Sequence, residues 1–409
     1  MNILIIGGAG YSPDANSVCI RNMTKEFVSE GHKVWILSMG DDYIKNPGRI
    51  EGATLCQQPM DYYRRLTFRT SRSNLWLLHL WFRIISVLRH VALIPFYPIT
   101  SPNRSRILAK KAKWIVKEND IKVAICVFNP YDNIYAGIKL KKFYKDDIKV
   151  VSYHLDLRTA SLNPLFLVRD YIRKHALQSL VYESKTVDKI LIPYSGEKET
   201  EEVKGIDKNK ICYVGFPMYI ERIEMHPCDL PFNKNDINIS YIGSLSKDNR
   251  NPGPILKMIE TVSILNKKRI VVHFWGSVGD AQAIIDRSQV AKYHGNVENQ
   301  YVSYIMSKSD FLLNIGNALA YDMLPSKVFG MFVTGKPIIN YISHPQDATI
   351  PYFERYNNSI DIKAFDFNQE EVDLLADYLN TNNTEPESTK DLLFEDFTPA
   401  YICKLILNI

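Results

Sequence analysis

The sequence has few cysteines, and their arrangement does not indicate a cross-linked or zinc-binding protein. Only six cysteines occur among 409 residues, they are widely scattered, and none forms a Cys-x-x-Cys pair. Scattered thiols are typical of proteins from a reducing compartment. The composition therefore argues against a disulfide framework and gives no support for a structural zinc site.

Long apolar runs and a leader are also missing. No run of about 18 uncharged apolar residues occurs, so we expect no membrane-spanning helix. Met1 leads directly into the apolar segment 3–6 without a basic leader, so we expect no signal peptide. Charged residues make up 23% and hydrophobic residues 46%, which favours packed cores over disorder, and the length favours two domains.

Acidic residues are absent from 62–117. This segment instead carries many basic residues, namely Arg64, Arg65, Arg69, Arg72, Arg83, Arg89, Arg104, Arg106, Lys110, Lys111, Lys113 and Lys117. Within it, 74–94 has the pattern of a wide apolar helix with a narrow polar face, which suits the interface of an anionic membrane. We expect membrane contacts from Trp76, Trp81, Phe82, Arg83 and Arg89. The alternative is a helix in the core of the first domain; nucleic acid is disfavoured because the apolar content is high.

Apolar runs and helical patterns alternate along both halves of the chain. Segment 3–6, the turn at Gly7 and Gly8, a helix over 17–30 and a strand over 34–37 form a βαβ unit. Further strands are expected in the first half at 123–128, 150–153, 189–193 and 211–214, and in the second half at 239–242, 270–275, 311–315 and 338–341. This pattern predicts an α/β protein with two Rossmann-like, doubly wound parallel-sheet domains that face a cleft.

The domain boundaries follow from composition. We expect a first domain over 1–218, a linker over 219–236 that is rich in proline, a second domain over 237–385, and a C-terminal helical segment over 386–409.

Two stretches of the second half suit a diphosphate. Pro325, Ser326 and Lys327 begin a predicted helix, where backbone N–H groups and a lysine attract anions. The loop after strand 239–242 contains Gly243, Ser244, Lys247 and Arg250, which could add charge-assisted hydrogen bonds. The same residues also suit a capped helix with a solvated lysine and an ordinary polar loop.

These motifs resemble glycosyltransferase family 4 and related bacterial polysaccharide and lipopolysaccharide glycosyltransferases of the GT-B type. The resemblance rests on Pro325-Ser326-Lys327, on Gly335-Lys336-Pro337, and on the strand ends near Gly276 and His294. It implies a GT-B architecture, with the second domain binding a nucleotide sugar and the C-terminal helical segment over 386–409 able to cross back to the first domain. The residues that it implies at the donor are Gly8, Gly243, Ser244, Arg250, His294, Asn296, Pro325, Ser326 and Lys327, with His294 and Asn296 near the base.

The sequence departs from the family at two acids. Many retaining members carry two glutamates eight residues apart, and the corresponding positions here are Asp322 and Gly330. The first acid is shortened and the second is absent, so recognition of the ribose must differ. Catalytic candidates are Asp322 and, at the end of strand 150–153, His154 and Asp156, either of which could act as the general base of an inverting transferase. A structural hydrogen-bonding role for His154 and Asp156 is the alternative.

The resemblance implies a metal-independent hexosyltransferase that uses a nucleotide-diphosphate sugar, with a UDP-sugar favoured. The acceptor would be a lipid-linked or saccharide molecule in bacterial surface polysaccharide synthesis. No cofactor, metal or nucleic acid is expected, and the sequence has no Asp-x-Asp. The basic apolar segment predicts a cytoplasmic protein peripheral to the inner face of the plasma membrane. A non-hydrolysing nucleotide-sugar epimerase and a non-catalytic nucleotide-sugar-binding protein are the alternatives.

Overall fold

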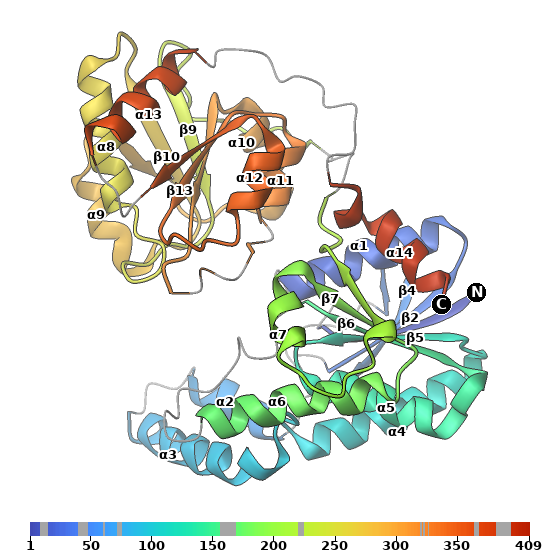
Figure 1. Cartoon of the computed structure of the whole chain (residues 1–409). Coiled ribbons are helices and arrows are strands. Elements are labelled where there is room, and N and C mark those ends of the chain that lie inside the picture. The colour runs from blue at the N-terminus through green and yellow to red at the C-terminus, as the bar shows by residue number, and fades with distance from the viewer. Residues whose placement is uncertain are drawn as a thin grey trace. The chain divides into compact units, whose positions relative to one another are not determined.

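The computed structural model shows two compact α/β units (Figure 1). It describes residues 1–8, 15–39, 48–59, 62–71, 76–155, 169–219, 225–319, 321, 324–325, 327–363, 368–381 and 394–409. Unit 1 comprises Met1–Met218 together with Asp396–Ile409, and unit 2 comprises Tyr219–Glu395.

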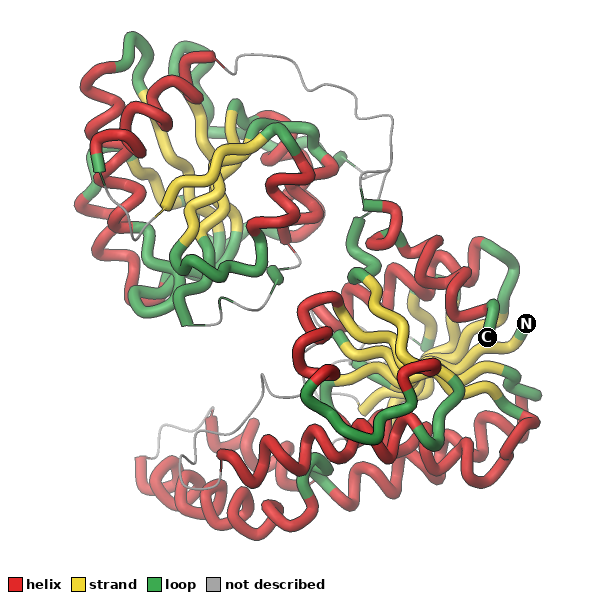
Figure 2. Tube along the Cα trace, viewed as in Figure 1, coloured by secondary structure: helices red, strands yellow, loops and turns green. Residues whose placement is uncertain are grey.

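Unit 1 is built on an eight-stranded sheet with the order β3-β4-β2-β1-β5-β6-β7-β8. Its strands are β1 (Asn2–Ile6), β2 (Lys33–Met39), β3 (Arg49–Ile50), β4 (Ala53–Gln58), β5 (Val123–Phe128), β6 (Lys149–His154), β7 (Lys189–Pro193) and β8 (Ile211–Val214). All neighbouring strands are parallel except β3 and β4. The central strands are continuous apolar runs because helices cover both faces of a parallel sheet, as Figure 2 shows.

The helices of unit 1 are α1 (Ala15–Ser29), α2 (Tyr62–Ser71), α3 (Trp76–Leu93), α4 (Pro102–Asn119), α5 (Tyr131–Tyr144), α6 (Arg169–Ser184), α7 (Glu197–Glu201) and α14 (Pro399–Leu407). The last of these, α14, follows unit 2 in the sequence but packs against α1. Cys403 of α14 takes part in this contact, and its Sγ lies 3.7 Å from the carbonyl oxygen of Met23 in α1. Ile402, Cys403 and Ile406 are buried there.

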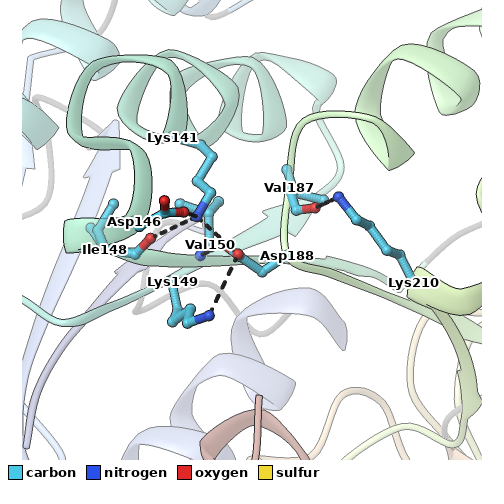
Figure 3. A network of polar contacts seen from close by, with 8 residues as sticks. All are labelled: Lys141, Asp146, Ile148, Lys149, Val150, Val187, Asp188 and Lys210. Carbon is cyan, nitrogen blue, oxygen red and sulfur yellow. Dashed lines mark hydrogen bonds and ion pairs between the residues drawn. The ribbon is translucent and has the colours of Figure 1, made fainter.

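Lysine and aspartate side chains tie the amino-terminal ends of β6 and β7 to α5 (Figure 3). Lys141 Nζ lies 2.8 Å from Asp188 Oδ1 and donates to the carbonyl oxygen of Ile148 at 3.1 Å. The other oxygen of Asp188 accepts a hydrogen bond from the backbone N–H of Val150 at 2.8 Å. This network lies at the opposite end of these strands from His154, so we assign it a structural role.

Unit 2 has a six-stranded, entirely parallel sheet with the order β11-β10-β9-β12-β13-β14. Its strands are β9 (Ile237–Ile242), β10 (Ile270–Trp275), β11 (Ala291–Tyr293), β12 (Phe311–Ile315), β13 (Ile338–Ile342) and β14 (Ser359–Lys363). Its helices are α8 (Gly253–Leu265), α9 (Gln282–Arg287), α10 (Asn299–Lys308), α11 (Lys327–Val333), α12 (Ile350–Tyr356) and α13 (Gln369–Thr381). Two parallel, doubly wound sheets confirm the predicted fold class.

Candidate functional site

The strand order of each sheet indicates where a ligand would bind. In unit 2 the order reverses between β9 and β12, and in unit 1 between β1 and β5. Ligands of doubly wound sheets bind beyond the carboxyl ends of the strands at such a reversal. Gly243 follows β9, and Lys327 begins the helix after β12, so two residues predicted to bind phosphate lie at the reversal of unit 2.

Glycines keep the carboxyl edge of β9 and β10 free of side chains. Gly243 and Gly276 follow these two strands, with φ angles of 149° and 115° that residues with a side chain rarely adopt. A Cβ atom at Gly276 would lie 2.3 Å from the carbonyl oxygen of Gly243. The backbones of the two turns therefore pack closely on each other, and together they form a shelf that carries no side chain at these two positions.

Lys327 places an ammonium group beside this shelf. Its Nζ lies 4.2 Å from the centroid of the Tyr241 ring, and a Cβ at Gly243 would lie 3.7 Å from it. The residue as a whole is half-buried, but Nζ itself is shielded from solvent and has no hydrogen-bond partner in the described part of the chain. Burial, and then the charge of Arg250, hold the pKa of this ammonium well below its usual range. A buried cation in this state favours an anionic ligand.

Arg250 supplies a second cation. Its Nε donates to Asn317 Oδ1 at 2.7 Å, and its Nη1 lies 3.5 Å from Ser244 Oγ. The loop that carries it folds back on itself through backbone hydrogen bonds between Ser246 and Arg250. Within the described ranges neither Arg250 nor Lys327 forms an ion pair, so their positive charge is available to a diphosphate.

The predicted helix start contributes less than expected. Helix α11 has only seven residues, so its dipole is a weak source of anion affinity. Pro325 precedes it and accepts a backbone hydrogen bond from Val328, whereas Ser326 and Asp322 lie outside the described residues. Gly330 lies within α11, and a Cβ there would have one neighbour within 4 Å, the Met306 Cε atom at 3.7 Å.

His294 and Asn296 lie at the end of β11, two strands away from Gly243. Asn296 is exposed. The His294 ring is half-buried and stacks on Trp275 with a centroid distance of 4.8 Å, and its Nε2 lies 2.9 Å from His273 Nδ1. The site residues of unit 2 therefore fall into a cationic group at β9 and an aromatic group at β10 and β11, and their roles in binding remain predictions.

Sequence reasoning missed Asp347, a buried carboxylate in the loop after β13. Its Oδ1 accepts hydrogen bonds from the backbone N–H and the hydroxyl of Thr349 at 2.9 and 2.7 Å. Its Oδ2 has no partner among the described residues, and burial raises the pKa of the carboxyl. A Cβ at Gly316, which follows β12, would lie 2.3 Å from that Oδ2. The only sequence signal was an acid in a loop after a strand, which is common in loops without function.

In unit 1, His154 ends β6 but is only 2% exposed. Its Nε2 lies 2.8 Å from Oε1 of the buried Glu183, which also accepts a hydrogen bond from Ser152. The ring stacks on Phe128 at a centroid distance of 5.2 Å. Glu183 was not foreseen, because an acid near the end of a helix carries no sequence signal that links it to a strand end. The structure thus shows His154 in the hydrogen-bonded role that was the alternative, and its role as a base stays a prediction.

The structure says less about the other predicted site residues of unit 1, Asp156 and Gly8. Asp156 lies outside the described residues. Gly8 follows β1 with a φ of 56°, at the reversal of the sheet. A pocket of about 120 Å³ lies near the end of β5, lined by Tyr97, Pro98, Thr100, Phe128, Asn129, Tyr131 and Ala176. The described residues contain no cluster of three or more His, Cys, Asp or Glu side chains that could hold a metal ion.

Helix α3 turns its apolar side chains outward. Among the α3 residues whose exposure the structure describes, the large exposed side chains other than Arg83 are all apolar, namely Trp76, Leu77, Leu78, Leu80, Trp81, Ile84, Val87, Leu88 and Val91. The opposite side contacts α2, where the Phe82 ring stacks on Tyr63 and the Arg89 guanidinium lies 3.9 Å from the Tyr63 ring centroid. A helix of a water-soluble core has the reverse orientation.

The expectation of no membrane-spanning helix stays a prediction, and one segment of this region bears on it. The segment Trp76–Phe96 has 21 residues and is long and apolar enough to cross a membrane, with none of it buried. It contains no uncharged run of about 18 residues, because Arg83 and Arg89 interrupt the apolar sequence. Length and composition are the only support for a span, and two arginines near the middle of a bilayer would be costly.

Comparisons with known proteins bear on the fold. No family model matches the chain, and no curated protein matches it by sequence. Among solved structures, a glycosyltransferase from Rickettsia africae ESF-5 is 13% identical with a TM-score of 0.58, covering 100% of this chain and 97% of that one. The lipopolysaccharide outer core galactosyltransferase WaaB is 16% identical with a TM-score of 0.57, covering 100% and 98%.

Epimerases also match over their full length. The UDP-GlcNAc 2-epimerase from Methanocaldococcus jannaschii is 11% identical with a TM-score of 0.55, and the match covers 100% of both chains. Identities this low establish the fold and leave the activity open. With two Rossmann-like parallel sheets in succession and full-length matches of this kind, the chain has the GT-B fold.

Proposed function

We propose that the protein is a glycosyltransferase that moves a sugar from a nucleotide-diphosphate donor, with UDP as the favoured nucleotide, to a lipid-linked or saccharide acceptor in surface polysaccharide synthesis. The observation that carries the proposal is the unpartnered, buried Nζ of Lys327 beside Arg250 and the Gly243 turn. Solved glycosyltransferases of the same fold, among them WaaB and WaaG, support it.

The chemistry follows from where charge develops. When the bond between the sugar and the diphosphate breaks, negative charge grows on the leaving phosphate oxygens. Lys327 and Arg250 would neutralise that charge, and such fixed cations stabilise the transition state more than the ground state. We propose that this pair acts without a metal or cofactor; unchanged turnover after dialysis against EDTA would support that part, and loss of turnover restored by Mg²⁺ would refute it.

We further propose that unit 1 docks on the cytoplasmic face of an anionic membrane through the outward side of α3. Trp76, Trp81 and Leu88 would enter the interface, while the exposed Arg83 would remain at the level of the head groups and Arg89 would stay against Tyr63. Another exposed aromatic residue, Trp114 on α4, has the Lys111 ammonium 3.6 Å from its ring centroid. A lipid-linked acceptor would explain why the protein carries such a surface.

An epimerase is the competing activity, because a UDP-GlcNAc 2-epimerase shares the fold at full coverage. The exposed apolar face of α3 favours the transferase, since a soluble nucleotide sugar gives an epimerase no need for a membrane. The two activities differ in product: a transferase releases free nucleoside diphosphate and an extended acceptor, whereas an epimerase returns an isomeric nucleotide sugar.

Calorimetric titration with nucleoside diphosphates and nucleotide sugars tests the proposal. We expect one nucleoside diphosphate to bind, Lys327→Ala to weaken it at least tenfold, and Lys308→Ala, which removes an exposed lysine of α10, to leave it unchanged. If no nucleotide binds the wild-type protein, the assignment as a nucleotide-sugar enzyme is wrong.

A further inference from the structure

A chain of hydrogen bonds in unit 2, here called the relay, joins Asp310, Asn238, His273 and His294. The donor and the acceptor of each bond follow from the contacts of Asn238. Asp310 Oδ2 lies 3.1 Å from Asn238 Nδ2. The same nitrogen lies 3.0 Å from the carbonyl oxygen of Asn233 and 3.3 Å from that of Asp236. Three acceptors around one atom identify it as the amide nitrogen, so the other terminal atom of Asn238 is the oxygen.

That oxygen fixes the tautomer of His273. Asn238 Oδ1 lies 3.2 Å from His273 Nε2, and because an amide oxygen only accepts, Nε2 must carry the hydrogen. His273 is 1% exposed, and burial, followed by the nearby His294 and Lys292, lowers its pKa to about 3. The ring is therefore neutral near pH 7, and its Nδ1 is an acceptor.

The same reasoning fixes His294. Its Nε2 lies 2.9 Å from His273 Nδ1 and must donate to it. Burial, and then Lys292, lowers the pKa of His294, so this ring is also neutral and its Nδ1 has a lone pair and no hydrogen. No described residue is a hydrogen-bond partner of that Nδ1.

Aromatic packing prevents the ring from escaping this state by rotation. His294 lies against Trp275 at an interplanar angle of 27° and against His273 at 19°. Phe232 covers the group, with its ring centroid 4.8 Å from that of His273. A flip of the His294 ring would break its bond to His273, so the ring presents a fixed acceptor at the end of β11.

The position of His294 relative to the cationic group suits the base of a nucleotide. Gly276 contacts the Gly243 backbone on one side, and its N–H donates to the carbonyl oxygen of Gly295 at 2.8 Å on the other. His294 is thus two strands, or about 10 Å, from the Gly243 turn. A ribose can bridge from a diphosphate at Lys327 to a base at His294 along this glycine-lined edge.

We propose that Asp310, Asn238 and His273 act as positioning residues that hold His294 Nδ1 as an acceptor for the ring N–H of the donor's base, which selects uracil over cytosine. Uracil carries a hydrogen on N3, whereas cytosine has a lone pair there. Two facing lone pairs leave both groups unpaired, and sites built for one hydrogen-bonding partner reject the analogue that lacks it. This inference rests on the proposed function, since it assumes a nucleotide at Lys327.

The test compares UDP, CDP, N3-methyl-UDP and inorganic pyrophosphate by calorimetry. We expect UDP to bind at least tenfold more tightly than CDP and N3-methyl-UDP. His294→Phe retains an aromatic stack but removes the acceptor, so it should bring the UDP-to-CDP ratio below about threefold without changing pyrophosphate affinity, and His294→Gln should partly restore the ratio. His175→Phe in α6 of unit 1 is the matched control and should leave the ratio unchanged.

A spectroscopic measurement distinguishes the loss of a positioning role from general damage to the fold. In ¹⁵N-histidine spectra, His294 should show a protonated Nε2 and an unprotonated Nδ1, and His273→Phe should abolish that single-tautomer signature and lower the UDP-to-CDP ratio. Equal affinity of the wild type for UDP and CDP, or an unchanged ratio in His294→Phe, would overturn the relay while pyrophosphate binding kept the proposed function intact. Failure of every diphosphate to bind would overturn both.

Discussion

Replacement of Lys327 by methionine should stabilise unit 2 and weaken donor binding at the same time. An unpartnered buried donor costs about 1–3 kcal/mol, and a charged one costs more. The contact of Nζ with the Tyr241 ring offsets roughly 0.5–2 kcal/mol of this. The unpartnered charge outweighs the ring contact, so Lys327→Met should raise stability by about 1 kcal/mol, or roughly 2–4 °C in the melting temperature of a domain of this size.

The affinity for UDP should fall in Lys327→Met, although the stability of unit 2 rises. Loss of one charge-assisted hydrogen bond to a phosphate costs about 1.5–3 kcal/mol, which is roughly a 10–150-fold loss of UDP affinity. Thermal unfolding and calorimetry on the same preparations measure both effects. A destabilised Lys327→Met protein would show that Nζ has a structural partner, and unchanged UDP affinity would show that no phosphate lies there.

The sign of the pH dependence is fixed by the direction of the pKa shift. The pKa of Lys327 is lower in the folded protein than its ordinary value of 10.5, so the unfolded chain binds more protons in the interval between the two values. The free-energy cost of burying the ammonium is therefore complete below the folded-state pKa, and it declines as the pH rises toward 10.5. The stability advantage of Lys327→Met should shrink over the same interval, and UDP affinity of the wild type should fall as the ammonium is lost; an advantage that grows with pH would contradict the assignment.

Three further changes test other parts of the structure. Gly330→Ala should stabilise unit 2 by about 0.5–1 kcal/mol in denaturant unfolding, because a helical alanine is favoured and its Cβ would meet only Met306 Cε at 3.7 Å; destabilisation would reveal a contact not seen here. Asp188→Ala should destabilise unit 1 by about 2–4 kcal/mol in the same assay, because Lys141 loses its largely buried partner, and a loss below about 0.5 kcal/mol would mean that solvent replaces the pair. Trp81→Glu on the outward side of α3 should reduce sedimentation with vesicles of anionic lipid more than tenfold while leaving UDP affinity unchanged, and undiminished sedimentation would remove α3 from the membrane contact.

The fold was predictable because its strands are apolar runs followed by turn residues. Segments such as β5 and β10 are buried on both faces, so their sequences are apolar almost throughout. Strand β4 was missed because Ala53–Gln58 mixes polar and apolar residues at the side of the sheet, where it pairs with the two-residue β3. Sequence pattern locates central strands well and peripheral ones poorly.

The candidate site was only partly predictable, for a different reason. Lys327, Arg250 and Gly243 stand next to recognisable strand ends and turns, so the sequence placed them together. The relay from Asp310 to His294 joins residues from β9, β10 and the ends of two other elements, and such side-chain geometry has no local sequence signal. For His154, the position at a strand end left a general base and a structural role both open, and the sequence did not indicate that its ring would be a buried partner of Glu183.

The return of α14 to unit 1 bears on the order in which the protein can fold during synthesis. Unit 2 is encoded by one continuous stretch, Tyr219–Glu395, and can complete its core as soon as that stretch has left the ribosome. Unit 1 cannot, because the side of α1 around Met23 remains uncovered until Ile402, Cys403 and Ile406 of α14 have been made. The nascent chain therefore carries an unfinished first unit, with exposed apolar surface, for the whole time needed to translate the second, and α14 completes unit 1 only after that.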